Sequence, residues 1–362
     1  MPTVPFLGSY GDISGSGLMF RNRIINGDMS IYQRQFAATT NGSYSLDRWF
    51  LAKTNGASES VGQNTDAPVG FSYSLRNTIS VGDASIGATE YSGISQRIEG
   101  YNIRDLGFGT ANARSVTVQF WVKSTVPGSY TGNIGNENAT RLCPFSYTIN
   151  NANTWEFKTI TLPGCPDGTW NTTNGVGLAV FFYGALGSSF LGGTSGVWNS
   201  AGQYGSGTPV NGIGSNGNIF AITGVQLEAG PAPSSFEYLP FHIQLFQCQR
   251  YYEKSYNYEV VPGTATDFGI TYLVGSSDAG GAIGPTIFFK NIKRTTPSAF
   301  GAYTRTGLDG WLYGRNGATG TIPTASLNTG LLGASGGLVY GNVGANWVVA
   351  WINGHWVASS EF

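Results

Sequence analysis

The chain has 362 residues, long enough for two or three domains, and its hydrophobic share of 41% excludes a natively disordered polypeptide. Its 19 lysines and arginines balance 20 aspartates and glutamates without forming a basic cluster, so the net charge of -1 predicts no nucleic-acid partner. The longest apolar run, Leu178 to Tyr183, is too short to cross a bilayer, and no membrane insertion is expected.

Residues 1–20 contain two prolines and four glycines and show no hydrophobic periodicity. We interpret this segment as an N-terminal docking peptide in which Val4, Phe6, Leu7 and Tyr10 contact a neighbouring protein. Apolar side chains in an extended tail suit folding on binding. A disordered start without a binding role is the alternative.

Residues 21–239 consist of short apolar alternations separated by polar, glycine-rich turns. Val116, Val118 and Phe120 alternate in the way expected of a strand with one face on a core. Several such strands without intervening helices predict an all-β fold, an antiparallel jelly-roll sandwich. The glycine-rich stretch 184–218 is expected to form long loops that serve as a binding or packing surface.

The segment 240–255 has the periodicity of a helix and begins with a proline, which suits a first helical turn. Phe241, Leu245, Cys248 and Tyr252 recur in it at three- and four-residue spacing. This pattern predicts a short linking helix whose apolar face is buried.

Residues 256–362 are expected to form a smaller C-terminal β-sandwich domain at the distal tip of the molecule. A strong strand pattern at 287–296 ends at Pro297. Asn353 and Gly354 stand between apolar pairs near the end of the sequence, and both tolerate the positive φ of a type I′ turn. They predict a terminal hairpin.

Six motifs in order carry a family resemblance: Asn22–Arg34, Tyr44–Phe50, Ile94–Gly100, Val118–Lys123, Thr223–Gly230 and Pro240–Lys254. With them the chain resembles bacteriophage tail-fibre and prophage tail proteins that carry a carbohydrate-module-like, galactose-binding-like β-sandwich. The resemblance implies a non-enzymatic structural component of the virion, a tail fibre attached to the tail or baseplate. It also implies recognition of a host-surface glycan by a protein that is made in the host cytoplasm and carried in the virion tail.

The residues themselves also argue against catalysis. The sequence has only two histidines, and nothing in it converges on a nucleophile and a base, so we expect no enzyme activity. A glycosidase-like pair of carboxylates stays open, because sequence alone cannot place any two acids at the required separation. The acids available for such a pair are Glu90, Glu99, Asp105, Glu137, Glu156 and Asp167.

Sugar rings stack on flat aromatic side chains, so aromatic residues in polar loops are the candidate receptor-binding residues. They are Trp170, Trp198 and Tyr204 in the first domain, and Trp311, Tyr313, Arg315 and Trp356 in the C-terminal domain. A subunit contact or core packing is the alternative for each. Trp49, Trp121 and Trp155 lie in strand-like sequence and are expected in the core.

The family resemblance suggests a structural calcium ion held by Asn26, Asp28 and Glu228, because it places an Asn-Gly-Asp near the first strand and an acid near the last. A turn-forming role for Asp28 is the alternative, and no other cofactor is expected. Cys143, Cys165 and Cys248 show no metal-binding spacing and are expected as free thiols, with a Cys143–Cys165 disulfide as the alternative.

Low charge and apolar residues on both flanks of the helix, such as Phe246 and Tyr251, predict a homotrimer. The other expected partners are phage tail or baseplate proteins and a host-surface glycan bound at the distal tip. Two further functions stay open: a free-standing carbohydrate-binding module protein, and a virion decoration protein without a receptor role.

Overall fold

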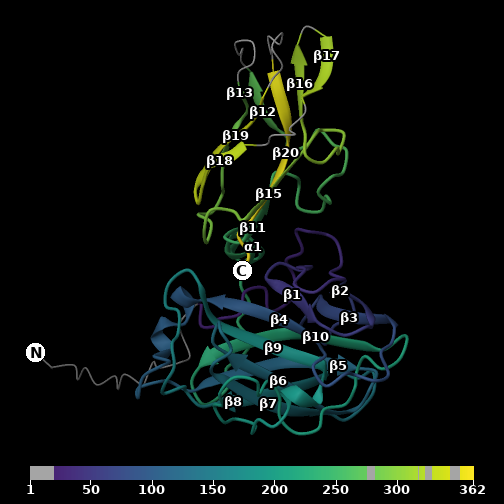
Figure 1. Cartoon of the computed structure of the whole chain (residues 1–362), viewed down its shortest axis with the longest axis vertical. Coiled ribbons are helices and arrows are strands. Elements are labelled where there is room, and N and C mark those ends of the chain that lie inside the picture. Colours follow the sequence, from purple (N-terminus) through teal and green to yellow (C-terminus); the bar gives the residue numbers. More distant parts are fainter. Residues whose placement is uncertain (1–19, 275–281, 317, 323–327, 343–350) are drawn as a thin grey trace, which may run out of the picture.

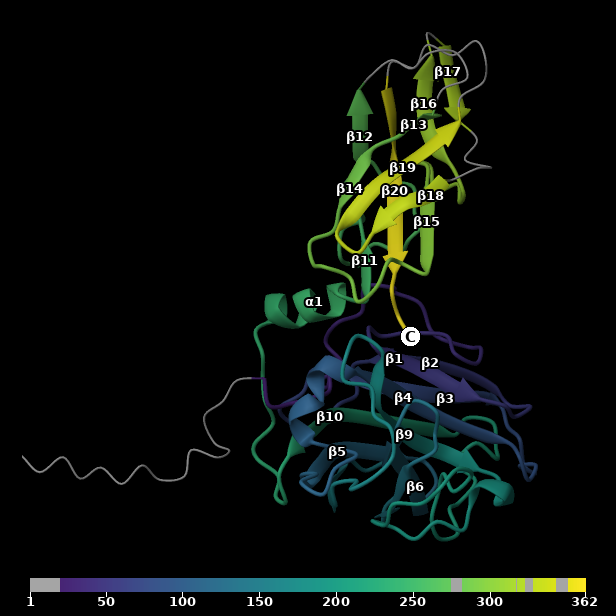
Figure 2. The same cartoon turned by 60° about the vertical axis from the view of Figure 1, so that its left-hand side comes forward.

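The computed structural model describes residues 20–274, 282–316, 318–322, 328–342 and 351–362. They form two β units, the sandwich (residues 20–239) and the C-terminal unit (residues 252–362), with helix α1 at the junction (Figures 1 and 2). Strands of the C-terminal unit run along the long axis of the molecule, and those of the sandwich run across it. Val4, Phe6, Leu7 and Tyr10, the expected docking residues, lie outside the described residues.

The sandwich contains two five-stranded sheets in which every pairing is antiparallel. The first sheet has the order β1 (Trp49–Lys53), β4 (Tyr91–Glu99), β9 (Val176–Leu186), β6 (Gly128–Gly135) and β7 (Leu142–Ile149). The second has the order β2 (Ser58–Asn64), β3 (Ser74–Val81), β10 (Ile219–Ala229), β5 (Val116–Ser124) and β8 (Glu156–Leu162). The 3-10 helices η1 (Gly100–Asn102), η2 (Arg104–Leu106) and η3 (Ser188–Phe190) lie between strands. The prediction of an all-β antiparallel sandwich is confirmed.

The sandwich core lies between the sheets and follows the period-two pattern of the strands. Phe120 of β5 faces Phe182 of β9 with ring centroids 4.8 Å apart, and both side chains are buried. Trp49 is also buried, as expected. Trp121 and Trp155 are only half-buried, so their assignment to the core is wrong. Trp121 alternates with core residues of β5 and therefore points away from the core.

Helix α1 (Phe241–Gln249) is shorter than the predicted helix, which spanned residues 240–255. Within the described residues, no helix is long and apolar enough to cross a bilayer. Residues Tyr252–Lys254 form strand β11 instead, because their backbone pairs with the last strand of the chain. The predicted burial of the apolar face is wrong at Phe241, which is 51% exposed. A polar residue, Gln244, is buried there and donates a 3.0 Å hydrogen bond to Asp28 of the sandwich.

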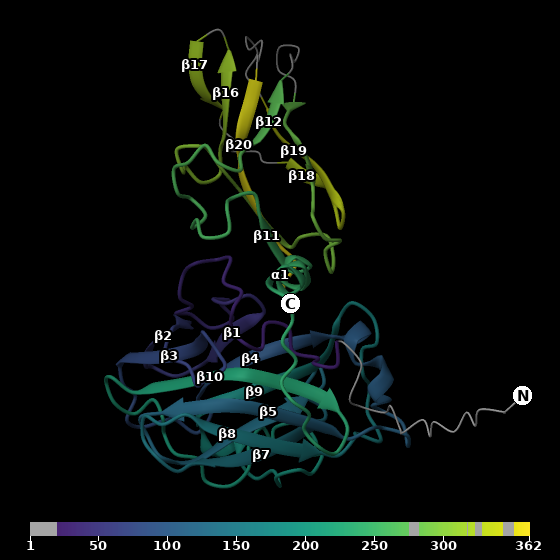
Figure 3. The same ribbon diagram turned by 180° about the vertical axis from the view of Figure 1, so that it is seen from behind.

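The C-terminal unit is built around its last strand, β20 (Trp351–Ser359), which pairs with β11, β12 (Thr271–Val274), β15 (Ala299–Tyr303) and β16 (Leu312–Asn316). Strand β17 (Ala318–Ile322) extends this sheet beyond β16. A second sheet pairs β19 (Gly336–Asn342) with β13 (Ala282–Ile283), β14 (Thr286–Phe288) and β18 (Asn328–Gly333). Figure 3 shows both sheets from behind.

The predicted hairpin at Asn353 and Gly354 is wrong, because both residues lie inside the continuous strand β20. Asn353 pairs with neighbours on both sides, Tyr272 and Tyr313. A Cβ at Gly354 would lie 2.7 Å from a methyl carbon of Leu312, so glycine is present for a close approach between strands. Pairing with distant strands overrode the local turn signal.

A buried network of ion pairs joins the two units; we call it the seam, formed by Arg34, Asp47 and Arg48 of the sandwich with Tyr252 and Glu361. The Glu361 carboxylate pairs with both arginines, lying 3.2 Å from Arg34 Nη2. The Arg34 guanidinium also covers the ring of Tyr252 at 3.9 Å. Burial by itself lowers the pKa of a guanidinium, but Glu361 and the other acidic groups around each arginine together outweigh it and raise the pKa of Arg34 and Arg48.

We expect Glu361→Gln to lower the free energy of unfolding by about 3–5 kcal/mol, because it leaves Arg48 buried without a counter-charge and Arg34 with Asp47 alone, 3.8 Å away. Urea unfolding of the full chain, followed by tryptophan fluorescence, measures this change. Glu259→Gln, a change at an exposed carboxylate, is the control and should leave the midpoint unchanged. Equal midpoints for both variants would show that the seam does not stabilise the chain.

Candidate functional site

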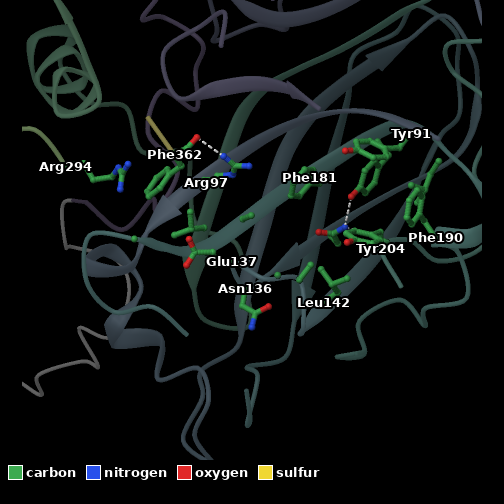
Figure 4. Close-up of a pocket in the computed structure, with 18 residues that line it drawn as sticks. Tyr91, Arg97, Asn136, Glu137, Leu142, Phe181, Phe190, Tyr204, Arg294 and Phe362 are labelled. Atoms are coloured by element: carbon green, nitrogen blue, oxygen red, sulfur yellow. Dashed lines mark hydrogen bonds between the residues drawn. The ribbon is translucent and has the colours of Figure 1, made fainter. Parts of the chain in front are cut away.

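A groove of about 570 Å³ crosses the outer face of the first sandwich sheet (Figure 4). Its lining comes from β4, β6, β7 and β9, from the loops that follow β6 and β9, and from two residues of the C-terminal unit. The volume lies in the range of small-ligand sites. This groove is the candidate binding site.

The floor of the groove is set by strand alternation. On β9, Val180 and Phe182 point into the core, so Ala179, Phe181 and Tyr183 point outward into the groove. Phe181 and Tyr183 stack with ring centroids 5.8 Å apart at 10°. The floor therefore offers an aromatic surface beside a small residue that leaves space above it.

One end of the groove is walled by aromatic rings from a strand and a loop. Phe190 of η3 contacts Tyr91 of β4 and Tyr204 edge-to-face, at centroid distances of 5.9 and 5.1 Å. All three rings are half-buried, so each presents part of its surface to the groove. Partial burial raises the pKa of the Tyr91 hydroxyl, which keeps it a neutral hydrogen-bond donor at physiological pH.

Asn133 of β6 fixes this loop onto the sheet. Its Nδ2 donates to the Tyr183 hydroxyl at 3.0 Å and to the Tyr204 carbonyl oxygen at 2.8 Å. The carbonyl can only accept, so the amide nitrogen must face it. The Asn133 Oδ1 atom is buried and accepts no hydrogen bond from the described residues. Burial also raises the pKa of Tyr183, so its hydroxyl keeps its proton.

The opposite end of the groove is charged and belongs to both units. Arg97 of β4 covers the Phe50 ring at 4.8 Å and donates a 2.8 Å hydrogen bond to the Phe362 carbonyl oxygen. Arg294 and the Phe362 ring complete this end (Figure 4). Among the described residues that line the groove, Glu137 is the single carboxylate, whereas glycoside hydrolysis ordinarily uses two. The groove combines aromatic surface with hydrogen-bonding groups, which is chemistry for binding.

Of the receptor residues expected in the sandwich, only Tyr204 lines the groove. Trp170 packs edge-to-face against Phe108 and Trp198 in a separate cluster, and 9% of its surface is exposed. Its Nε1 donates to the Asp167 carbonyl oxygen at 3.0 Å. The expectation of an exposed ring at Trp170 is therefore wrong, because the cluster fills the sandwich core at its edge.

In the C-terminal unit, Trp356 is buried between Phe289 and Phe300, and its Nε1 donates to Thr271 Oγ1 at 3.0 Å. The expectation that it is presented on a loop is wrong, because it belongs to the central strand β20. Trp311 and Tyr313 are half-buried and do not line the groove, and Tyr313 belongs to β16, which lies at the end of this unit away from the sandwich (Figure 1). The side chain of Arg315 lies outside the described residues.

The residues expected to bind calcium all have protein partners. Asp28 accepts hydrogen bonds from Ser30 and Gln244, and Glu228 accepts two from Ser234. Asn26 accepts from the Ile31 backbone amide at 2.8 Å, which makes it part of a turn. Among the described residues, no group of three His, Cys, Asp or Glu side chains could hold a metal ion.

The three cysteines are free and buried. Burial raises the pKa of Cys143 to about 12 and that of Cys165 to about 11, so both are protonated thiols at neutral pH. A Cys143–Cys165 disulfide is absent from this structure.

Sequence reasoning named Glu137 only as a candidate acid and missed most of the rest of the groove: Tyr91, Arg97, Phe181, Phe190, Arg294 and Phe362. A signal existed at β9, where aromatic residues occupy both phases of the alternation, at Phe181 and Phe182. A strand with aromatic side chains on its solvent phase indicates a covered or ligand-binding outer face. No local pattern could have placed Arg294 and Phe362 there, because they reach the groove through docking of the C-terminal unit.

No family model and no curated protein matches the sequence. Solved structures that are similar to it include the enzymatically active domain of tailspike protein 4 from bacteriophage CBA120, at 15% identity and a TM-score of 0.31. That alignment covers 58% of this chain and 22% of the tailspike chain.

Two carbohydrate-binding modules are also similar. TmCBM61, in complex with β-1,4-galactotriose, has 11% identity and a TM-score of 0.30, covering 58% of this chain and 99% of the module. The family 11 module from Clostridium thermocellum has 12% identity and a TM-score of 0.27, covering 54% and 96%. At these values the similarities carry no argument about function, which rests on the groove.

We expect Asn133→Ala to loosen the loop around Tyr204, because the amide donor to the Tyr204 carbonyl oxygen is lost, together with the one to Tyr183 of β9. Hydrogen exchange should become faster at the Gly205 amide, which donates to the Phe190 carbonyl oxygen at 3.0 Å. The loss of these bonds should cost about 1–3 kcal/mol in chemical denaturation. Asn151→Ala, in an exposed turn, is the matched control. Unchanged exchange across residues 188–206 would contradict this role.

Proposed function

We propose that this chain is a carbohydrate-binding structural protein of a bacteriophage tail, and that the sandwich groove binds a glycan of the host surface. The observation that carries the proposal is the groove itself. It joins the rings of Phe181, Tyr91 and Tyr204 to hydrogen-bonding groups on one open sheet face. A pyranose ring presents an apolar C–H face and a rim of hydroxyls, and each has a counterpart here.

The chemistry of the lining favours binding without reaction. The described lining supplies Glu137 as its carboxylate, and the thiols and histidines do not line the groove. Tyr183 and Tyr91 hold their protons and act as neutral hydrogen-bonding groups. We therefore keep the assignment as a non-enzymatic protein within this proposal.

The phage-tail part of the proposal is supported by the six ordered motifs of the sequence, from Asn22–Arg34 to Pro240–Lys254. Tail or baseplate partners, virion localisation and a docking role for residues 1–20 belong to the same proposal. The proposed receptor site, however, is no longer the distal tip that was expected from the sequence. Trp356, one of the residues expected to bind the receptor there, is buried, and the groove lies in the sandwich, next to the C-terminal unit.

Glycan binding can be tested on an array of bacterial lipopolysaccharides and capsular polysaccharides, followed by calorimetric titration of the glycans that bind. We expect Tyr204→Ala and Phe181→Ala to weaken binding by about 1–3 kcal/mol each, or roughly fivefold to 150-fold, because a stacked ring is lost. Tyr204→Ala keeps the backbone carbonyl that Asn133 holds, so the loop should stay in place.

Phe157→Ala is the matched control, because this ring is 46% exposed on the second sheet, away from the groove. It should leave glycan affinity unchanged. If no glycan on the array binds the full chain, or if all three variants bind equally well, the groove is not a carbohydrate site.

The homotrimer also belongs to this proposal. Phe241 and Phe246 of α1 are 51% and 50% exposed, which leaves an apolar helix surface uncovered in one chain. Static light scattering of the full chain should give three times the 38.3 kDa mass of one chain. A monomer mass at micromolar concentration would refute the trimer without affecting the groove.

A further inference from the structure

Two residues of the C-terminal unit line a groove that otherwise belongs to the sandwich. Arg294 precedes β15, and Phe362 follows β20. Both lie at the charged end of the groove beside Arg97, as Figure 4 shows. The groove is therefore complete only when the two units are docked.

Phe362 is held in place from several sides. Its carbonyl oxygen accepts the 2.8 Å hydrogen bond from Arg97 of β4. The Arg294 guanidinium covers its ring at 4.1 Å, and the Arg48 guanidinium lies 5.4 Å from the ring centroid. The ring of Tyr251 packs at 6.1 Å. These contacts fix the ring while leaving it half-buried, with part of its surface toward the groove.

Arg294 links the same end to the sandwich backbone. Its Nη1 donates to the Asn174 carbonyl oxygen, and Asn174 Nδ2 donates back to the Arg294 carbonyl oxygen, each at 3.0 Å. Its Nε and Nη2 bind the carbonyl oxygens of Ser360 and Glu361 at 2.8 and 3.0 Å. Asn174 directly precedes the groove residues at the start of β9, so Arg294 joins the groove edge to the last residues of the chain.

We propose that the groove is a two-unit binding site in which an oligosaccharide extends from the Tyr91–Tyr204 end to the Phe362 ring. Phe362 is then a specificity-determining residue that contacts the far sugar of the ligand. This inference rests on the proposed function, because it assigns a longer ligand and an additional contact to the same groove.

Coupling between ligand binding and docking follows from this geometry. A ligand that contacts both units binds the docked arrangement more tightly than the undocked one, and linkage requires it to stabilise docking by the same factor. A ligand short enough to touch only the aromatic end has no such effect. Binding measured with ligands of different lengths therefore distinguishes a two-unit site from a site that lies within the sandwich alone.

The experiment uses the full chain and size-fractionated oligosaccharides from a polysaccharide that binds on the array. Phe362→Ala should weaken binding of the long fractions about tenfold, the loss expected for one stacked ring, and leave the shortest binding fraction unchanged. Phe288→Ala, at a ring of the same unit that is 80% exposed and outside the groove, is the control.

Small-angle scattering of each variant shows whether docking is preserved. If Phe362→Ala extends the molecule, Phe362→Leu, which keeps an apolar side chain in place without an aromatic face, replaces it and should still lose affinity for long fractions only. Glycan binding that is equal in the wild type and both Phe362 variants at every length would overturn the two-unit site while leaving the proposed function intact. Absence of any glycan binding overturns both.

Discussion

The pairing of one carboxylate, Glu361, with two buried arginines is the contact on which the arrangement of the molecule depends. Arg34 and Arg48 lie inside the sandwich edge, where a charge without a partner would be strongly unfavourable. Their partner arrives from the last residues of the chain, more than 300 positions later. Within the sandwich Arg34 also has Asp47 as a counter-charge, whereas Arg48 gains its carboxylate only in the docked state, so the C-terminal unit has one favoured position on the sandwich.

A second ion pair, at the junction between the two units, supports the same position of the C-terminal unit. Arg250, at the end of α1, makes two hydrogen bonds of 2.8 and 2.6 Å to Glu99 of β4, and the Tyr251 hydroxyl donates to the same carboxylate. Strand β4 also carries Arg97 on its groove face. One strand of the sandwich thus holds the linker and forms part of the groove, which ties the geometry of the groove to that of the junction.

The groove follows from ordinary sheet geometry combined with one long loop. Small residues such as Ala179 and Gly135 leave space over the first sheet, and the loop after β9 returns across it to place Phe190 and Tyr204 at one end. An open antiparallel sheet face of this kind presents a row of outward side chains at fixed spacing, which suits an extended ligand such as an oligosaccharide chain. The docked C-terminal unit then forms one end of the groove, through Arg294 and Phe362.

The sequence by itself determined the all-β class, the sandwich before residue 240, the buried Trp49 and the glycine-rich loop with Tyr204, because period-two alternation and turn composition are local signals. Which side chains come together in the candidate site was decided only by the tertiary structure. Asp47 and Arg48 are neighbours in sequence, and Arg97 and Glu99 are two positions apart, but three of these side chains pair with residues elsewhere in the chain and Arg97 pairs with none of the described carboxylates. Likewise Trp356, Asn353 and Gly354 look like loop and turn residues locally. Strand pairing across the C-terminal unit buries them, since contacts between residues far apart in sequence outweigh local propensity.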